Sequence, residues 1–214
     1  MDIKYITVVN NYITLNIALL QSPGINKDNI VIIDNTLYNR PISYRYNDAI
    51  KELLKDPDPA WLVFCHQDFY MREDLLSRLP YLDKNCIYGP IGISHKTLLG
   101  RIIQTNGVPI GNICNKCIVD TIDAMCIIIN KDTIRKHNLS FDENFRYHFY
   151  VEDFCLQARA KGISTRTLQL NCQHKSRTLY GDIKSPEFKE SLNILKKNGE
   201  LLIQQLVFME VHLQ

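Results

Sequence analysis

Residues 61–70 read WLVFCHQDFY, and this stretch predicts more of the fold than any other part of the chain. Its first five residues form a short apolar run with the length of a buried strand. The run stops at three polar residues, His66, Gln67 and Asp68. Open α/β sheets bind ligands at the carboxyl ends of such strands, although Asp is also an ordinary turn or cap residue. The rest of the chain has to decide between a site and a turn.

The segments before this strand repeat the same arrangement. Strands are expected at residues 3–9 and 29–33, both buried, with helices at 12–21 and from an N-cap at Ser43 through Lys55. Alternating strands and helices predict a parallel sheet with right-handed crossovers. Every strand ends in Asn or Asp, so one edge of the sheet should gather these side chains: Asn10, Asn11, Asp34, Asn35, His66 and Asp68.

The second half of the chain alternates less regularly. Glycine-containing residues 91–118 lack periodicity and suggest a hairpin or a flap, a type of long loop that is often functional. No repeat or linker interrupts the sequence, which predicts one domain over residues 1–214. The other expected elements are helices at 73–79 (closed by Pro80), 132–137, 152–161 and 186–211, and strands near 86–88 and at 122–129 and 163–170.

Composition excludes several classes of protein. The 214 residues are 45% hydrophobic and 22% charged, as expected for a globular domain with a substantial core. A net charge of +2 is too small for a dedicated nucleic-acid binder. No apolar run approaches the roughly 20 residues of a membrane span, and the N-terminal residues lack the layout of a signal peptide. We therefore expect a cytoplasmic protein.

The seven cysteines are odd in number and scattered, which suits a reduced compartment. Only Cys114 and Cys117 have a spacing that suggests zinc. A structural zinc site needs four ligands, and the chain has no second pair to complete one. We expect two free thiols in a loop rather than a zinc site.

Six stretches of the chain form a recognisable set: WLVFCHQDFY at 61–70, YGPIG at 88–92, GRI at 100–102, VDTIDAM at 119–125, HFYVEDFCLQARAKG at 148–162 and CQHKS at 172–176. The last two are the most discriminating. Together these stretches resemble the GT-A fold of family-2-like inverting glycosyltransferases. The similarity runs over most of the chain and is greatest to a small bacterial glycosyltransferase-like group related to a streptomycin-biosynthesis protein.

This resemblance implies a Rossmann-like, three-layer α/β/α fold with a mostly parallel central sheet and a C-terminal amphipathic helix. Residues 1–90 would form a nucleotide-binding half, residues 91–185 an acceptor and catalytic half, and residues 186–214 the helix. The helix has a mixed polar face, whereas membrane-surface helices tend to be richly basic. We therefore expect it to pack on the sheet or form a homodimer, with peripheral membrane association as the alternative.

The resemblance also implies a nucleotide-sugar donor, with UDP as the nucleotide, and a divalent cation, Mn²⁺ or Mg²⁺. Asp68 matches the last acid of the family's Asp-x-Asp motif, and His174 matches a downstream histidine that helps to hold metal or diphosphate. A cation is needed because two like unit charges ~4 Å apart repel by roughly 4 kcal/mol at an effective dielectric near 20. His66 replaces the family's first Asp, which leaves strict metal dependence open. A loop histidine bonded to backbone is the alternative for His174.

Asp153 matches the Asp of the family's Glu-Asp motif, which implies the general base that takes the acceptor's proton. Glu152 is the second catalytic candidate, as its neighbour or as the alternative base. Acids in the first turn of a helix also stabilise it by roughly 0.3–1 kcal/mol without any chemistry. Arg40 also suits a turn brace, and Asp123 a buried structural acid. The residues implied for donor binding are Asn10, Asn11, Asp34, Asn35, Arg40, His66, Gln67, Asp68 and Asp123.

We therefore expect an inverting glycosyltransferase that moves a sugar from a nucleoside-diphosphate donor onto a hydroxyl of a glycan or lipid-linked acceptor. A catalytically weak or inactive nucleotide-sugar-binding protein is the alternative, favoured by the altered His66–Asp68 segment and the short chain. A nucleotidyltransferase fits less well, because no glycine-rich, basic loop follows the first strand.

Overall fold

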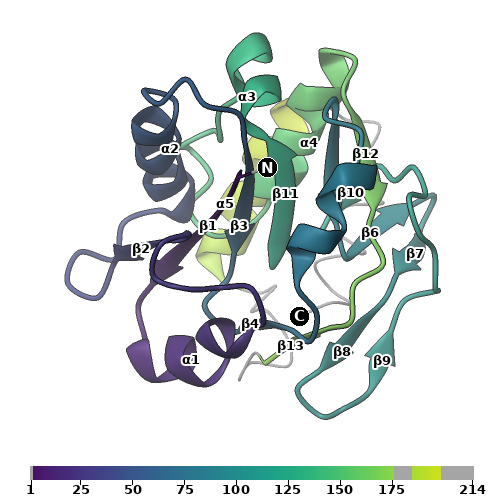
Figure 1. The fold of residues 1–214 in the computed structure, drawn as a ribbon. Helices are drawn as coiled ribbons and strands as arrows, with labels where there is room; N and C mark the ends of the chain where they lie inside the picture. Colours follow the sequence, from purple (N-terminus) through teal and green to yellow (C-terminus); the bar gives the residue numbers. More distant parts are fainter. Residues whose placement is uncertain (1, 176–184, 199–214) are drawn as a thin grey trace.

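The main sheet of the computed structural model, which describes residues 2–175 and 185–198, has six strands in the order β12-β5-β11-β3-β1-β2 (Figure 1). β1 pairs in parallel with β2 and β3, and β5 pairs in parallel with β12. β11 runs antiparallel to both of its neighbours. The mostly parallel sheet predicted from the sequence is confirmed. The six strands are β1 (Asp2–Val9), β2 (Ile30–Asp34), β3 (Ala60–Cys65), β5 (Cys86–Gly89), β11 (Cys126–Asn130) and β12 (Ser164–Thr167).

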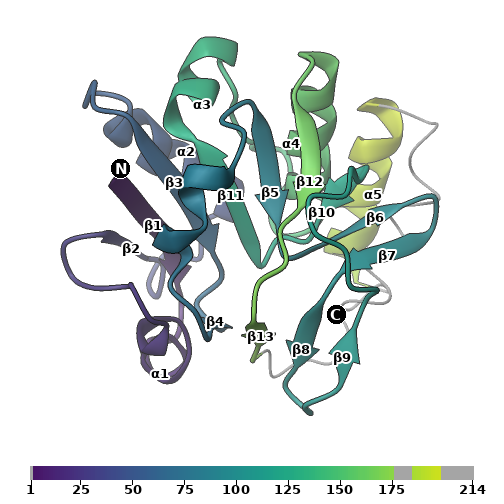
Figure 2. The ribbon, with the colours of Figure 1, turned by 45° about the vertical axis from the view of Figure 1, so that its right-hand side comes forward.

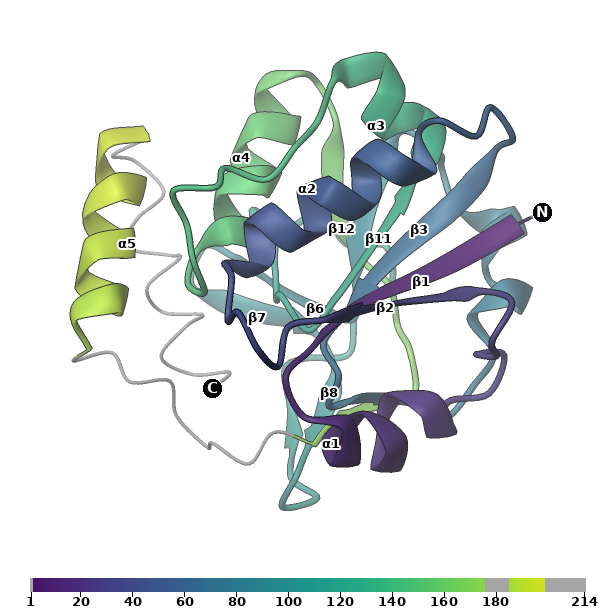
Figure 3. The ribbon, with the colours of Figure 1, turned by 90° about the vertical axis from the view of Figure 1, so that its left-hand side faces the viewer.

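Helices cover one face of this sheet, as Figure 3 shows, with the C-terminal helix on the outside of the layer. Successive strand residues point to opposite faces, and on this face Ile6, Leu62 and Phe64 belong to the apolar core. Phe188 and Leu195 of the C-terminal helix join the same core. The helices are α2 (Ile42–Leu53), α3 (Lys131–His137), α4 (Tyr150–Ala160) and α5 (Pro186–Asn198).

The opposite face carries a second core that includes Tyr5, Trp61 and Val63. Short elements rather than long helices cover this face, and they contribute Leu15, Leu19, Leu75 and Leu79 to its core. With both faces covered, every residue of β3 is buried, as its continuous apolar sequence predicted. These elements are α1 (Tyr12–Ile17) and the 3₁₀ helices η1 (Leu19–Gln21), η2 (Leu75–Ser77) and η3 (Leu79–Tyr81).

Two small sheets flank the main one, and Figure 2 shows one of them, β4-β13-β8-β9, beneath it. In this sheet β13 pairs antiparallel with β4, which places His174 opposite Phe69. Residues 91–118, where the sequence suggested a hairpin or a flap, contain two hairpins, β6–β7 and β8–β9. The small sheets contain β4 (Phe69–Met71), β8 (Ile102–Gln104), β9 (Pro109–Ile110), β13 (Cys172–His174), β6 (Ile91–Ser94), β7 (Thr97–Gly100) and β10 (Thr121–Ile122).

Some predicted elements are wrong in detail. Ser43 is not the N-cap of α2, because Pro41 occupies that position and the buried Ser43 Oγ donates to the Phe145 carbonyl at 2.6 Å. β2 is an edge strand rather than a buried one, and its Ile32 is 39% exposed. The helix expected at 12–21 divides at Ala18 into α1 and η1.

Two further segments divide where a side chain bonds to the backbone. The helix expected at 73–79 is replaced by η2 and η3, because Asp74 accepts from the Leu76 amide and Pro80 begins a new turn. The strand expected at 122–129 splits into β10 and β11, because Asp123 Oδ1 accepts from the Met125 amide at 2.8 Å. In both places a local side-chain bond competes with regular structure.

The expectation of two free thiols is also wrong, because Cys114 and Cys117 form a disulfide. The helix expected over 186–211 is observed as α5 over Pro186–Asn198, and residues 199–211 lie outside the described residues. Within residues 2–175 and 185–198, no helix combines the length and apolar character needed to cross a membrane.

Candidate functional site

A pocket of about 130 Å³ lies at the carboxyl ends of β1, β2 and β3. The three strands are parallel, so their ends and the polar residues that follow them meet at one edge of the sheet. We call this hollow the strand-end pocket. Its lining residues are Val8, Asn10, Asn35, Asn39, Ile42, Tyr46, His66, Gln67, Asp68 and Tyr147.

Gln67 joins two of these strand ends. Its Oε1 accepts from the backbone amides of Asn10 and Asn11 at 3.2 and 3.0 Å, and its Nε2 donates to Asn10 Oδ1 at 2.5 Å. Asn11 in turn caps α1, because its Oδ1 accepts from the Thr14 amide at 3.0 Å. Gln67 and Asn11 therefore fix the edge of the pocket.

Asn35 shapes the opposite edge. It is 3% exposed, and its side chain bonds to both the amide and the carbonyl of Arg40, at 3.0 and 2.9 Å. The Arg40 guanidinium lies over the rings of Tyr44 and Tyr38, 5.2 and 6.0 Å from their centroids. The structure thus shows Asn35 bracing the 35–40 turn, with Arg40 exposed beside aromatic rings rather than lining the pocket.

Asp34 and Asp123 do not line the strand-end pocket. The exposed Asp34 carboxylate accepts from the Thr36 amide and hydroxyl at 2.8 and 2.7 Å, and from the Tyr12 hydroxyl at 3.2 Å. The Thr36 amide is the main cause that lowers the pKa of Asp34. Asp34 therefore stays ionised on the rim of the sheet edge, whereas Asp123 turns the chain between β10 and β11.

Three side chains next to Gln67 form a compact cluster. His66, Asp68 and His174 each offer a ligand atom, and these atoms lie within 4.8 Å of one another. His174 Nε2 lies 3.2 Å from Asp68 Oδ1. His66 Nε2 lies 3.0 Å from the Tyr150 hydroxyl at the start of α4. The cluster therefore joins the end of β3, the small sheet and α4.

The backbone holds this cluster in place. The His66 amide donates to the Met125 carbonyl at 3.0 Å, and the Lys175 amide donates to the Asp68 carbonyl at 2.8 Å. Pairing of β13 with β4 brings His174 to this point from more than a hundred residues away. The geometry depends on long-range pairing and not on local sequence.

Burial and charge act against each other in the cluster. Burial lowers the pKa of His66 to about 4, so this imidazole is neutral at pH 7. Burial alone would raise the pKa of Asp68, but the contact with His174 and its charge, together with the charge of His66, lower it to about 2. Burial likewise acts to lower the pKa of His174, but Asp68 outweighs it and raises that pKa above its ordinary value.

These residues fit a divalent cation. Among the described residues, Asp68 Oδ1 and His174 Nε2 are buried atoms without a well-aligned hydrogen bond, although they lie 3.2 Å apart. Buried polar atoms normally have such a partner. A carboxylate with two imidazoles suits Mn²⁺ better than Ca²⁺. The cluster includes the predicted ligands Asp68 and His174 and adds His66.

Glu152 and Asp153 lie in the first turn of α4 and are each 3% exposed. Gln157 Nε2 donates to Asp153 Oδ2 at 2.6 Å. The residue before α4, Phe149, has a φ of 64°, a left-handed conformation that is uncommon for a bulky side chain. Such conformations cluster at functional sites. Neither acid lines the strand-end pocket.

The sequence did not indicate the aromatic members of the site. Tyr147 lines the strand-end pocket, and its hydroxyl donates to Asn39 Oδ1 at 2.6 Å. Tyr46 also lines it while being 1% exposed. Tyr150 bonds to His66. The aromatic-rich loop before α4 was the available signal, but it could not show which rings are core and which reach the site.

Comparisons with known proteins bear on the fold. No protein-family model and no curated protein sequence matches the chain. Solved structures do match over 92% of it: S. aureus TarS at 12% identity and a TM-score of 0.62, TarS 1–349 in complex with UDP at 11% and 0.58, and GalNAc-T7 with UDP, GalNAc and Mn²⁺ at 8% and 0.61. The chain spans 39%, 65% and 48% of those chains, less than two thirds of each. These neighbours are GT-A glycosyltransferases, so the likeness shows the GT-A-like α/β fold that the sequence predicted.

Proposed function

We propose that this protein is an inverting glycosyltransferase that moves a sugar from UDP to a hydroxyl of a glycan or lipid-linked acceptor. The observation that carries the proposal is the His66–Asp68–His174 cluster, packed within 4.8 Å beside the strand-end pocket. The GT-A-like fold supports it, because two of the similar structures hold UDP and one of these also holds Mn²⁺. Within that fold, the sequence motifs favour the family-2-like bacterial group.

The donor would lie along the sheet edge with its nucleoside toward Asn10, Asn35 and Tyr147. The pocket of about 130 Å³ is smaller than the ~300–1,000 Å³ of sites that enclose a whole ligand. One part of the donor would therefore fill it, and the rest would extend over the rim. Asp34 and Arg40 stand on that rim, where the ribose or a phosphate would pass.

The diphosphate would lie at the cluster. A divalent cation held by Asp68, His174 and His66 would neutralise the diphosphate and stabilise the charge that develops on the leaving group. Tyr150 acts on the protein side, because its hydrogen bond to His66 Nε2 fixes the orientation of that ring. His66 is neutral at pH 7, so no proton has to leave it before it binds a cation.

Asp153 is the proposed general base, with Glu152 beside it. As the acceptor oxygen attacks the anomeric carbon, the bond from that carbon to the diphosphate breaks and the hydroxyl proton passes to Asp153. Attack from the face opposite the leaving group inverts the anomeric centre. Gln157 orients the carboxylate through its bond to Oδ2, and the helix N-terminus stabilises its charge before transfer.

The second candidate is a nucleotide-sugar-binding protein without turnover. The burial of Asp153 favours it, because a base that is 3% exposed needs an opening before an acceptor can reach it. The histidine in place of the motif's first acid points the same way. The two candidates differ in Asp153→Asn, which would lower turnover strongly in an enzyme while donor binding is retained, whereas a binding protein would show no turnover to lose.

Isothermal titration of UDP, with Mn²⁺ and then with EDTA, tests the proposal. We expect binding that needs Mn²⁺ and is lost in Asp68→Ala. The matched control is Asp58→Ala, which removes an exposed acid of the loop before β3. Binding would then justify a screen of UDP-sugars with glycan acceptors. Folded protein that binds UDP in neither condition, or equally well as Asp68→Ala, would overturn the site.

A further inference from the structure

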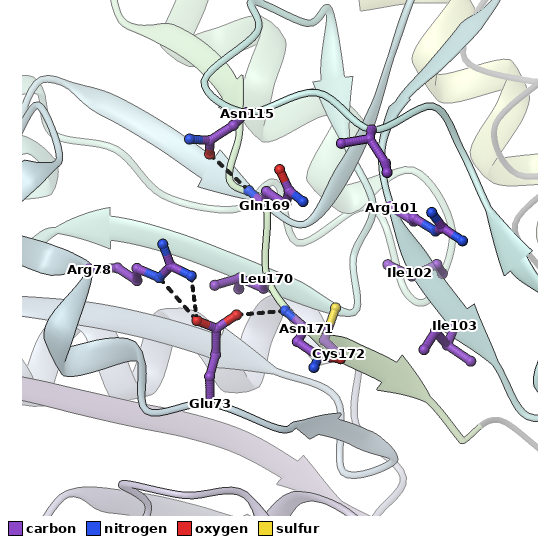
Figure 4. A pocket seen from close by; sticks show the side chains of 11 residues that line it. Glu73, Arg78, Arg101, Ile102, Ile103, Asn115, Gln169, Leu170, Asn171 and Cys172 are labelled. Atoms are coloured by element: carbon purple, nitrogen blue, oxygen red, sulfur yellow. Dashed lines mark hydrogen bonds and ion pairs between the residues drawn. The ribbon is translucent and has the colours of Figure 1, made fainter.

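A second, larger hollow lies beside the small sheet β4-β13-β8-β9. Nothing in the proposed transfer uses it. Its volume is about 590 Å³, within the range of sites that bind small molecules. It shares no lining residue with the strand-end pocket. We call it the side cavity, and Figure 4 shows Arg101, Ile102 and Ile103 on one side of it, facing Gln169, Leu170 and Asn171 of the segment between β12 and β13.

Hydrogen bonds make one wall rigid. Glu73 Oε2 accepts from Arg78 Nε and Nη2 at 3.0 and 2.7 Å, and Glu73 Oε1 accepts from the Asn171 amide at 2.6 Å (Figure 4). Both carboxylate oxygens are thus used within the wall. The charges of Glu73 and Arg78 cancel, and Glu73 is the only acid among the lining residues.

The disulfide loop supports the same wall farther along, at Gln169. Asn115 lies between Cys114 and Cys117, and its Oδ1 accepts from the Gln169 amide at 3.0 Å. Thr167 anchors the loop on both sides, because its hydroxyl accepts from the Cys117 amide at 3.0 Å and donates to the Cys114 carbonyl at 2.9 Å. The position of Asn115 is therefore fixed before any ligand arrives.

Arg101 supplies an unbalanced charge. Among the described residues its guanidinium makes no hydrogen bond or ion pair, although it lines the cavity. Its backbone is fixed, because its amide donates to the Pro90 carbonyl at 3.1 Å and Gly100, at φ +87°, turns the chain just before it. The side cavity therefore carries one net positive charge on a defined support.

The remaining lining groups suit a sugar. The side-chain amides of Gln169 and Asn171 have no partner among the described residues, so each can both donate to and accept from hydroxyl groups. Ile103, Leu170 and the 60%-exposed Ile113 add apolar surface to the lining. The amides can bond to sugar hydroxyls, the aliphatic side chains can pack on the C–H face of a sugar ring, and the guanidinium can pair with an acidic group.

We propose that the side cavity binds an acidic sugar unit, with Arg101 pairing with its carboxylate or phosphate group. The cavity is connected to the cluster through β13, because Cys172 lines the cavity and His174 belongs to the cluster. Residues two apart on a strand point to the same face and lie roughly 7 Å apart. If the proposed glycosyl transfer holds, the acidic unit belongs to the acceptor glycan, one or two units from the reacting hydroxyl.

The test is binding without nucleotide or metal, so its result does not depend on the donor site. Probes are a galacturonic acid trisaccharide for a carboxylate, glucose 6-phosphate for a phosphate, and maltotriose as the neutral match, followed by the amide shifts of Gln169 and Asn171 in NMR spectra. We expect an acidic probe to bind and maltotriose not to. Which acidic probe binds identifies the source of the charge.

The variants locate the site. Arg101→Gln should weaken binding of the acidic probe about tenfold, the loss expected for one charge-assisted hydrogen bond. Lys51→Gln, which removes an exposed charge on α2, controls for net charge and should bind normally. Gln169→Ala removes an amide without changing charge and should weaken binding severalfold. Failure of both acidic probes, equal binding of maltotriose, or wild-type affinity in Arg101→Gln would overturn the proposal.

Discussion

The strand-end pocket and the side cavity are both polar hollows, but they are built in different ways. The first lies where three parallel strands end, and its charged groups are partly buried and alter one another's pKa values. The second is formed by loops and a small sheet, and its unpaired charge, Arg101, is exposed. Buried coupled groups suit chemistry and metal binding, whereas a fixed exposed set suits recognition. Variants of the two regions should therefore separate reaction from recognition.

The largest effect is expected for Asp153→Asn. Loss of the proposed base should lower turnover about 10³-fold, since general base catalysis contributes roughly 10²–10⁴-fold. Binding of UDP and of the acidic sugar should stay within twofold, because Asp153 lines neither hollow. Initial rates with a UDP-sugar and titrations on the same preparation measure both. Asp132→Asn, which alters the first-turn acid of α3, is the matched control and should keep its rate. Full turnover in Asp153→Asn would remove this residue from the reaction.

The pH dependence of stability should be a property of the strand-end region. The folded state holds the pKa of His66 at about 4, against 6.5 in the unfolded chain, so below pH 6.5 the unfolded chain binds a proton that the folded one does not. Unfolding free energy of the metal-free protein should therefore fall as pH drops from 6.5 to about 4, by an amount of the order of 3 kcal/mol. The raised pKa of His174 acts mainly above pH 6.5, where its stabilisation is lost as pH rises, so it adds little to the slope in this window.

Urea denaturation at intervals across that window measures the slope. His66→Gln should flatten it, whereas His95→Gln, which alters an exposed histidine, should leave it unchanged. An unchanged slope in His66→Gln would show that His66 is not held neutral. No histidine lines the side cavity, so binding of an acidic sugar there should not follow this transition.

The next largest effect is expected on Mn²⁺ affinity, which should depend on the strand-end region and not on the side cavity. His174→Gln should weaken Mn²⁺ binding at pH 7.5 more than tenfold, because it removes one of three clustered ligand atoms. His66→Gln should have a similar effect if His66 acts as the third ligand. Titration of free Mn²⁺ by electron paramagnetic resonance gives both affinities. Acidic-sugar binding should be unaffected in each variant, and Mn²⁺ affinity that is unchanged in His174→Gln would contradict the cluster as a metal site.

The sequence could predict the parts of the site that follow directly from strand ends. The run before His66 is apolar on both faces, so its burial and the position of Asp68 follow from the sequence. Asn10 and Asn35 follow strands of the same sheet and meet at its edge. The resemblance to known motifs added His174, whose partner Asp68 is far away in the chain.

The rest depends on pairing that a single sequence does not encode locally. β13 was not expected, because Cys172, Gln173 and His174 lack β-branched residues and become a strand only between β4 and β8. Gln67 bonds to Asn10 and Asn11, which lie 57 and 56 positions earlier in the chain, so its bracing role could not be inferred. The side cavity gathers residues from four separate segments, and no spacing pattern connects them.

The smallest effect is expected where the disulfide loop supports the side cavity. In Cys114→Ser/Cys117→Ser the backbone bonds to Thr167 remain, so Asn115 should become less fixed but not lost. Acidic-sugar affinity should fall two- to fourfold, because an ordered wall costs less entropy on binding than a loose one. UDP affinity should stay the same.

Closing so short a loop contributes at most about 2 kcal/mol of unfolding free energy by the chain-entropy relation, and thermal unfolding monitors that loss. Dithiothreitol should reproduce the variant's affinity in wild type and have no effect on the variant itself. A larger loss of UDP than of sugar binding would mean that the two hollows are coupled and that the distinction between reaction and recognition does not hold.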